Sequence, residues 1–161
     1  MAKPVKLKEI TEAFEYPDNW EVFLNKRTGK IFFITEDDRL LLDGLEEGEE
    51  DIADLPEWQR SALPDLQKNR EAVQAGDCLA LPSRFDIHEW EIMRDFALSV
   101  EDIRKREQLL NAIHGRGAFR YFKDCVHRMG IADEWYRFRE HALEEIAIEW
   151  LEANGIPFER D

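Results

Sequence analysis

The stretch that decides the fold is HGRGAFRYFKDCVHRMG, residues 114–130. Two glycines, Gly115 and Gly117, interrupt the chain near its start. After Gly117, apolar residues recur at the three-and-four spacing of an amphipathic helix. They are Phe119, Phe122, Val126 and Met129. We predict a helix here, with this apolar side buried.

A second side of the same helix is basic. At about 100° per residue, its cations and its histidine fall in a narrow arc away from the apolar stripe. Together with Gly117 they form the candidate binding site for an anion or a partner: Arg116, Gly117, Arg120, Lys123 and His127. Two interpretations stay open. Either the arc binds something negative, or it pairs internally with glutamates of the last helix or of the acidic segment.

Charge is distributed unevenly along the chain. The formal net charge is −14, and residues 36–57 carry eleven acidic residues against one basic residue. Residues 115–130 carry four basic residues against one acidic residue. Because a strongly negative protein is repelled by phosphate backbones, general nucleic-acid binding is disfavoured, and only a focused basic site could support it.

The acidic segment is predicted to be a mobile loop over residues 36–55, since its glycines and like charges oppose compaction. The alternative is an acidic docking loop or a cation site. The calcium-loop pattern of alternating acids, a glycine and a distant glutamate is not met, so no metal site is predicted.

Length and composition favour one domain over residues 1–161. A chain of 161 residues with 43% hydrophobic content can build one sizeable core. No signal peptide and no membrane span are recognisable, so we expect a cytoplasmic protein. Cys78 and Cys125 lack disulfide or metal-ligand spacing and are expected to be reduced thiols.

The first part of the chain, residues 1–82, is predicted to mix helices with a small antiparallel sheet. A short helix is expected around Leu7, Ile10 and Ala13. Residues 20–34 alternate apolar and polar side chains around the turn sequence NKRTGK, which predicts a hairpin. A third strand is expected at residues 78–81, after a helix that starts near residue 56 and is interrupted at Pro64.

The second part, residues 83–161, is predicted to be a helical bundle, with residues 86–153 mainly helical. Asp86, His88 and Glu89 lie close together, as catalytic or metal-binding groups do. Helix capping explains them better, because Asp86 as an N-cap with Glu89 three residues later would form a capping box. The predicted class is therefore α+β: a hairpin plus one strand, packed with a C-terminal helical bundle.

Several segments together resemble one bacterial family of small acidic cytosolic proteins that is catalogued only as uncharacterised. The resemblance rests on the NKRTGKI hairpin, on LPSRFDIHEWEIMRDF, on a GRGAFR-FKD core at residues 115–120 and 122–124, and on IAIEW at residues 146–150. It implies a bacterial cytosolic protein. It brings no activity, cofactor or catalytic residue.

Function must therefore be inferred from the residues. The chain lacks a GxSxG elbow, a phosphate-binding Walker loop and an HExxH helix, so no catalytic residue and no cofactor are predicted. The leading hypothesis is a non-enzymatic interaction or regulatory protein that binds an unknown protein partner through the basic helix face. The alternatives are a phosphate or nucleic-acid site at the GRG helix start, and an enzyme of unrecognised type.

Overall fold

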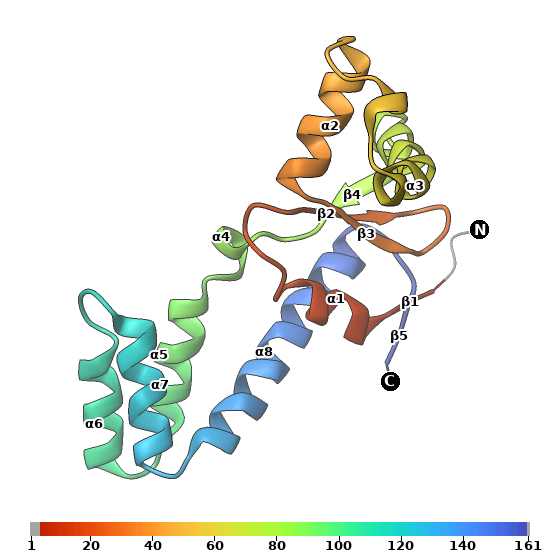
Figure 1. The fold of residues 1–161 in the computed structure, drawn as a ribbon. Coiled ribbons are helices and arrows are strands. Elements are labelled where there is room, and N and C mark those ends of the chain that lie inside the picture. Colours follow the sequence, from red (N-terminus) through yellow and green to blue (C-terminus); the bar gives the residue numbers. More distant parts are fainter. Residues whose placement is uncertain (1–3, 161) are drawn as a thin grey trace. The chain divides into compact units, whose positions relative to one another are not determined.

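The chain forms two compact units in the computed structural model, which describes residues 4–160 apart from the side chain of Phe85 (Figure 1). Unit 1 comprises Met1–Pro82 and Leu151–Asp161, and unit 2 comprises Ser83–Trp150. Unit 1 combines strands with helices, whereas unit 2 is helical, so the predicted α+β class is confirmed. That the two units form one cooperative domain stays a prediction.

The antiparallel sheet of unit 1 contains the predicted hairpin. Strands β2 (Glu21–Asn25) and β3 (Ile31–Ile34) pair with each other, and β4 (Cys78–Ala80) pairs with the other side of β2, giving the order β3-β2-β4. Phe23 on β2 lies opposite Phe32 and Ala80. Gly29 closes the hairpin loop with a φ of 72°, a conformation that glycine adopts without steric cost. The hairpin and its third strand are both confirmed.

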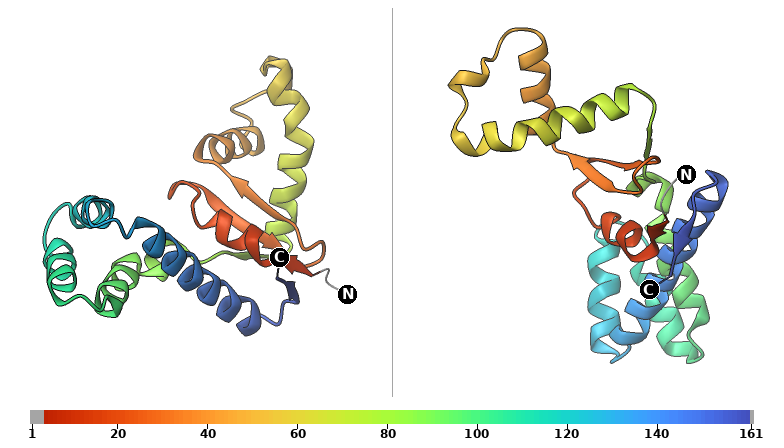
Figure 2. Two further views of the ribbon diagram at one scale, coloured as in Figure 1. Left: turned by 90° about the horizontal axis from the view of Figure 1, so that it is seen from below. Right: turned by 90° about the vertical axis from the view of Figure 1, so that its right-hand side faces the viewer.

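A second, parallel pair of strands joins two distant parts of unit 1. Strand β1 (Val5–Lys6) lies beside β5 (Phe158–Glu159), with Val5 opposite Phe158 (Figure 2). The N–H of Val5 donates to the carbonyl of Pro157 at 3.0 Å, and the Val5 side chain is buried. The helix α1 (Leu7–Ala13) follows directly and buries its predicted apolar stripe. The sequence analysis missed this pair, because two-residue strands are too short to show a periodic pattern.

The predicted acidic loop at residues 36–55 is wrong. Residues Glu36–Glu46 form helix α2, and Ile52–Asp54 form a short 3-10 helix, η1. The Thr35 hydroxyl accepts a hydrogen bond from the Asp38 N–H at 3.1 Å, and the Asp38 carboxylate accepts one from the Thr35 N–H at 3.1 Å. This capping box starts the helix, and the acidic first turn is favourable at the positive end of the helix dipole.

Helix α3 (Glu57–Gln74) packs on α2 and runs through Pro64 without interruption, so the predicted break is also wrong. Leucines from both sides of the proline hold the helix against its neighbours, which compensates for the missing backbone donor. The buried leucines of this cluster are Leu42, Leu55 and Leu63, with Leu41, Leu45 and Leu66 partly buried around them.

Unit 2 is built from consecutive helices, and residues 86–153 are mainly helical as predicted. The helices are α4 (Arg84–Ile87), α5 (Glu89–Ser99), α6 (Ile103–Ala112), α7 (Ala118–Arg128) and α8 (Ala132–Ala153), the end of which, from Leu151 on, belongs to unit 1. Figure 1 shows α5, α6 and α7 side by side. The core is aromatic: the ring of Trp135 lies edge-on to Phe122 at 4.7 Å between centroids and 5.4 Å from Phe96. These contacts anchor α7, the helix that carries the candidate site.

Candidate binding surface on helix α7

The turn that leads into α7 depends on two glycines. Gly115 and Gly117 adopt φ angles of 82° and 75°, in the left-handed region that favours glycine. A side chain at position 117 would also place its Cβ 3.3 Å from the ring of Tyr121. The turn therefore fixes where α7 begins. It also fixes the backbone position of Arg116, which lies between the two glycines.

The buried side of α7 differs from the predicted stripe: Met129 is only half-buried, and Ala118 and Cys125 are buried although they were not in it. Four residues of the helix are buried: Ala118, Phe122, Cys125 and Val126. Phe119, which was predicted to join them, is 49% exposed. It lies in the first turn of α7, at the end of the apolar stripe, whereas Phe122 one turn later is enclosed by other aromatic rings. The surface of α7 thus includes an exposed aromatic side chain.

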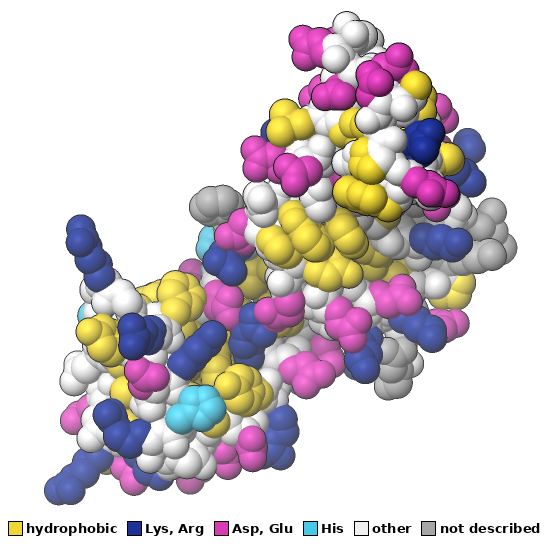
Figure 3. Space-filling view, in the orientation of Figure 1, with side chains coloured by type: hydrophobic (Ala, Val, Ile, Leu, Met, Phe, Trp, Pro, Cys, Tyr) yellow, Lys and Arg dark blue, Asp and Glu magenta, His cyan; other side chains and the backbone are white. Residues whose placement is uncertain are grey.

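The predicted cations are on the surface and are not neutralised by neighbours. Arg116, Arg120 and Lys123 are all exposed. Within residues 4–160, no carboxylate lies within 4.0 Å of their side-chain nitrogens. This includes Asp124, which lies one turn after Arg120 but forms no ion pair with it. We call Arg116, which lies in the turn just before the helix, together with Arg120 and Lys123 the basic face of α7. Lys and Arg side chains (dark blue) stand out over the α6 and α7 part of unit 2 in Figure 3.

Most other arginines of unit 2 have a defined partner. Arg139 pairs with Glu89, Arg106 donates to the carbonyl of Val100 at 2.9 Å, and Arg94 lies over the ring of Trp90 at 5.5 Å. Such contacts use a basic side chain to hold the helices together. The basic face of α7 has no such role in the described part of the chain, so internal pairing does not explain its charges.

His127, the remaining residue of the predicted arc, is engaged within unit 2. Its Nε2 lies 3.2 Å from the hydroxyl of Tyr136 on α8, and the two rings meet edge to face. His127 therefore contributes to the contact between α7 and α8. Arg116 and Gly117 lie in the turn before α7, Arg120 and Lys123 lie in its first two turns, and His127 lies near its end.

The Asp86, His88 and Glu89 group is divided among separate structural roles. The Asp86 carboxylate accepts hydrogen bonds from the N–H of Ser83 at 2.9 Å and from its hydroxyl at 3.0 Å, which lowers the pKa of Asp86. Ser83 is the N-cap of α4, so the prediction that Asp86 is the N-cap is wrong by three residues. The N-cap lies three residues earlier than predicted because α4 is a separate short helix, ended by His88 at a φ of 53°.

Some surface residues were not identified from the sequence. Arg104 and Lys105, at the start of α6, form no side-chain ion pair or hydrogen bond with other described residues. Exposed Phe119 could have been suspected from its place at the edge of the stripe.

Over residues 4–160, no group of three or more His, Cys, Asp or Glu side chains is placed to hold a metal ion. None of the helices in that range is long and apolar enough to cross a membrane.

Comparison with known proteins identifies relatives but no activity. Residues 2–161 match the profile of an uncharacterised protein family, UPF0158. The chain is 35% identical over 66 residues to UPF0158 protein PA5073 of Pseudomonas aeruginosa, an alignment that covers 40% of this chain and 43% of that protein. No solved structure matches the chain.

Proposed function

Given that the chain belongs to the uncharacterised protein family UPF0158, we propose its function from its own surface: it is a non-enzymatic interaction protein that binds an acidic segment of a partner protein through the basic face of α7. One observation carries the proposal. Arg116, Arg120 and Lys123 are exposed and make no ion pair within residues 4–160.

The physical argument is electrostatic. Like charges one helical turn apart repel each other by a few tenths of a kcal/mol per pair in water. A bound carboxylate replaces this repulsion by attraction, and two or three contacts at once also define the orientation of the partner. The net charge of −14 repels other acidic molecules elsewhere on the surface, so attraction is concentrated at α7.

Phe119 favours a protein segment as the ligand. It lies one residue before Arg120 and one turn before Lys123, and half of its surface is exposed. Aromatic side chains surrounded by charged ones are frequent anchors of protein interfaces, because burying the ring against a partner is favourable while the charges set the register. A partner segment that carries both carboxylates and an apolar side chain matches this surface.

A phosphate-bearing ligand is the second candidate, and the start of α7 favours it. Gly117 provides no side-chain cap, and the first turn holds no acidic residue. The free backbone N–H groups of a helix start attract anions, and Arg116 and Arg120 flank this one. Because of the overall negative charge, a small phosphate compound suits the site better than a nucleic-acid backbone.

Free Cys78 and Cys125 are consistent with the cytoplasmic location that we propose.

The test compares Arg120→Ala with a matched control, Lys68→Ala, which removes an exposed positive charge from α3 in unit 1. We expect Arg120→Ala to leave the free energy of unfolding within about 0.5 kcal/mol of wild type. Retention on immobilised poly-glutamate at low salt should fall for Arg120→Ala and not for Lys68→Ala, and added salt should abolish it by screening.

The outcomes separate the alternatives. Loss of stability without loss of retention would show that Arg120 is structural. Retention that is displaced by inorganic phosphate as effectively as by an acidic peptide would favour the phosphate site over a protein partner.

A further inference from the structure

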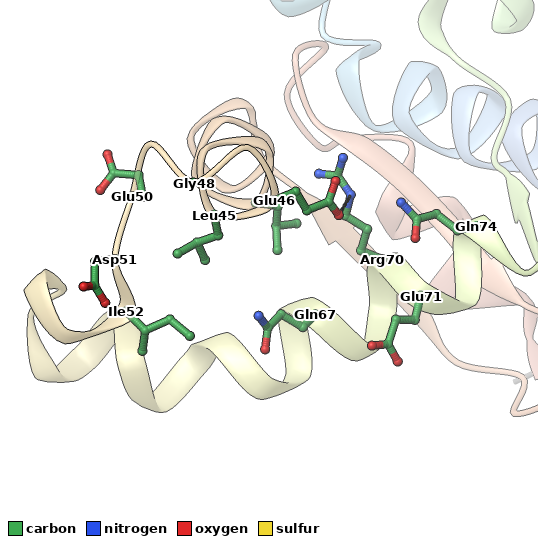
Figure 4. A pocket seen from close by; sticks show the side chains of 11 residues that line it. Leu45, Glu46, Gly48, Glu50, Asp51, Ile52, Gln67, Arg70, Glu71 and Gln74 are labelled. Atoms are coloured by element: carbon green, nitrogen blue, oxygen red, sulfur yellow. Dashed lines mark ion pairs between the residues drawn. The ribbon is translucent and has the colours of Figure 1, made fainter.

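Unit 1 contains a cavity of about 620 Å³ between α2, the segment that follows it, and α3. Figure 4 shows its lining, with Leu45 and Glu46 on α2, Ile52 on η1, and Gln67 and Arg70 on α3. The volume falls within the range of about 300–1,000 Å³ that is usual for ligand sites in proteins. The cavity belongs to a single unit and shares no residue with α7.

The two helices that form the walls are held together from both sides. The leucine cluster around Leu42 and Leu63 packs α2 against α3 on the inner side. On the rim, Arg70 of α3 pairs with Asp43 at 2.5 Å and with Glu46 at 3.4 Å, both on α2. Apolar contact and ion pairs together define the spacing of the walls. The cavity is therefore a built feature of the fold.

The negative charges left on the rim are unmatched. Arg70 is the only basic residue among those that line the cavity in the described part of the chain, and its charge is used by Asp43 and Glu46. Glu50 and Glu71 line the cavity and form no ion pair with other described residues. The rim therefore favours a positively charged occupant and repels nucleic acid or acidic peptides.

Backbone structure holds Glu50 in place. The N–H groups of Glu49 and Glu50 both donate to the carbonyl of Gly44, at 2.8 and 3.1 Å, and fold the chain back onto α2. A Cβ on Gly44 would lie 2.8 Å from the Glu50 Cγ, so the glycine leaves room for the aliphatic part of that side chain. The Glu50 carboxylate is thus carried by an anchored turn.

The lining is also partly apolar. Leu42 and Leu45 contribute from α2, and Ile52, which is 47% exposed, contributes from η1. A small cation alone would leave the Ile52 side chain in water. An occupant with an aliphatic side chain between its positive charges would cover it, and burial of apolar surface is favourable.

We propose that this cavity docks a basic segment of a partner protein, in which lysine or arginine side chains flank an aliphatic side chain. The basic groups contact Glu50 and Glu71 on the rim, and the aliphatic group packs against Leu45 and Ile52. Charge complementarity selects the partner, and the apolar lining distinguishes a protein segment from a simple polyamine. This inference is independent of the function proposed for α7.

The test uses the full chain and two synthetic peptides labelled for fluorescence anisotropy, one of lysine and leucine and one of lysine alone with the same charge. We expect the lysine–leucine peptide to bind more tightly. Ile52→Ala should weaken its binding about fivefold, a change that corresponds to about 1 kcal/mol, and should leave the lysine peptide unaffected. Glu50→Gln with Glu71→Gln should weaken binding of both peptides.

The controls are Glu134→Gln, which removes an exposed charge from α8, and Arg120→Ala on α7. Neither should change the affinity of either peptide, and circular dichroism should confirm that every variant is folded. Equal affinity for the two peptides, or insensitivity to Ile52→Ala, would overturn the proposal and leave only a nonspecific cation surface. Displacement of both peptides by spermidine at equal concentrations would do the same. Each of these results leaves the proposal for α7 untouched.

Discussion

The guanidinium Nε of Arg139 on α8 lies 2.5 Å from the carboxylate of Glu89, the first residue of α5. The two side chains are only 23% and 21% exposed. This ion pair connects the first and last long helices of unit 2 across a partly desolvated contact, where a charged hydrogen bond is worth more than at an exposed position.

Replacing Glu89 by glutamine should lower the free energy of unfolding by about 1–3 kcal/mol, because the partly buried contact with Arg139 would lose its negative charge. Urea denaturation measures the change. The matched control is Asp95→Asn, whose contact with the adjacent Arg94 is exposed, and we expect it to cost at most about 1 kcal/mol. Equal losses for the two variants would show that the Glu89–Arg139 pair is no stronger than a surface pair.

Asp86 should make the stability of the fold depend on acid pH. Hydrogen bonds from Ser83 lower its pKa in the folded protein, so its contribution is present above the unfolded pKa and is lost as the pH falls through the folded pKa. The difference in melting temperature between wild type and Asp86→Asn should therefore be largest near neutral pH and shrink below about pH 4. A difference that stays constant down to acid pH would contradict the assignment, and Asp124→Asn serves as the control without such hydrogen bonds.

His88 should tolerate glycine and reject a β-branched residue. Its φ of 53° joins α4 to α5, and a left-handed backbone costs a residue with a side chain about 1–2 kcal/mol. Relief of this cost competes with the greater chain entropy of glycine, so His88→Gly should raise the free energy of unfolding by up to about 1 kcal/mol. His88→Val should lower it. The same rank order in urea denaturation confirms the backbone role, and equal effects of Gly and Val argue against it.

Phe119 should matter for binding and not for stability. Phe119→Ala removes an exposed ring, so the free energy of unfolding should change by less than about 0.5 kcal/mol. Affinity for a peptide of glutamate and phenylalanine should fall, whereas affinity for poly-glutamate should not. Tyr121→Ala is the matched control, because Tyr121 is an exposed aromatic residue on the other side of the same helix. If Phe119→Ala and Tyr121→Ala behave alike, Phe119 is no anchor and only the charges of α7 remain as the proposed contact.

Regular patterns made much of the fold predictable. The hairpin, its third strand at Cys78–Ala80 and the helices of the second half follow from period-two alternation, from 3.6-residue spacing and from the residues that end them. Helix α2 was missed because its acidic composition outweighed two weaker signals. These were the Thr35 and Asp38 capping pair and the leucines that pack on α3.

The sequence predicted where the cations of the candidate site lie along the chain, but not whether they form ion pairs. Helical spacing places Arg120 and Lys123 on one face of α7, and Arg116 lies in the glycine turn that precedes the helix. Whether a carboxylate neutralises them depends on tertiary contacts, which spacing does not report. The exposure of Phe119 and the contact between His127 and Tyr136 also depend on tertiary contacts, so spacing did not predict them.

The pairing of β1 with β5 also sets an order on biosynthesis. Unit 1 starts first, yet its parallel strand pair cannot form until Phe158 and Glu159 have left the ribosome. By then every residue of unit 2 has been made, because Ser83–Trp150 lies between the two parts of unit 1. Nascent chains usually fold from the N-terminus onward. Here unit 1, which emerges first, is completed last. Unit 2 can form its aromatic core while unit 1 still lacks strand β5.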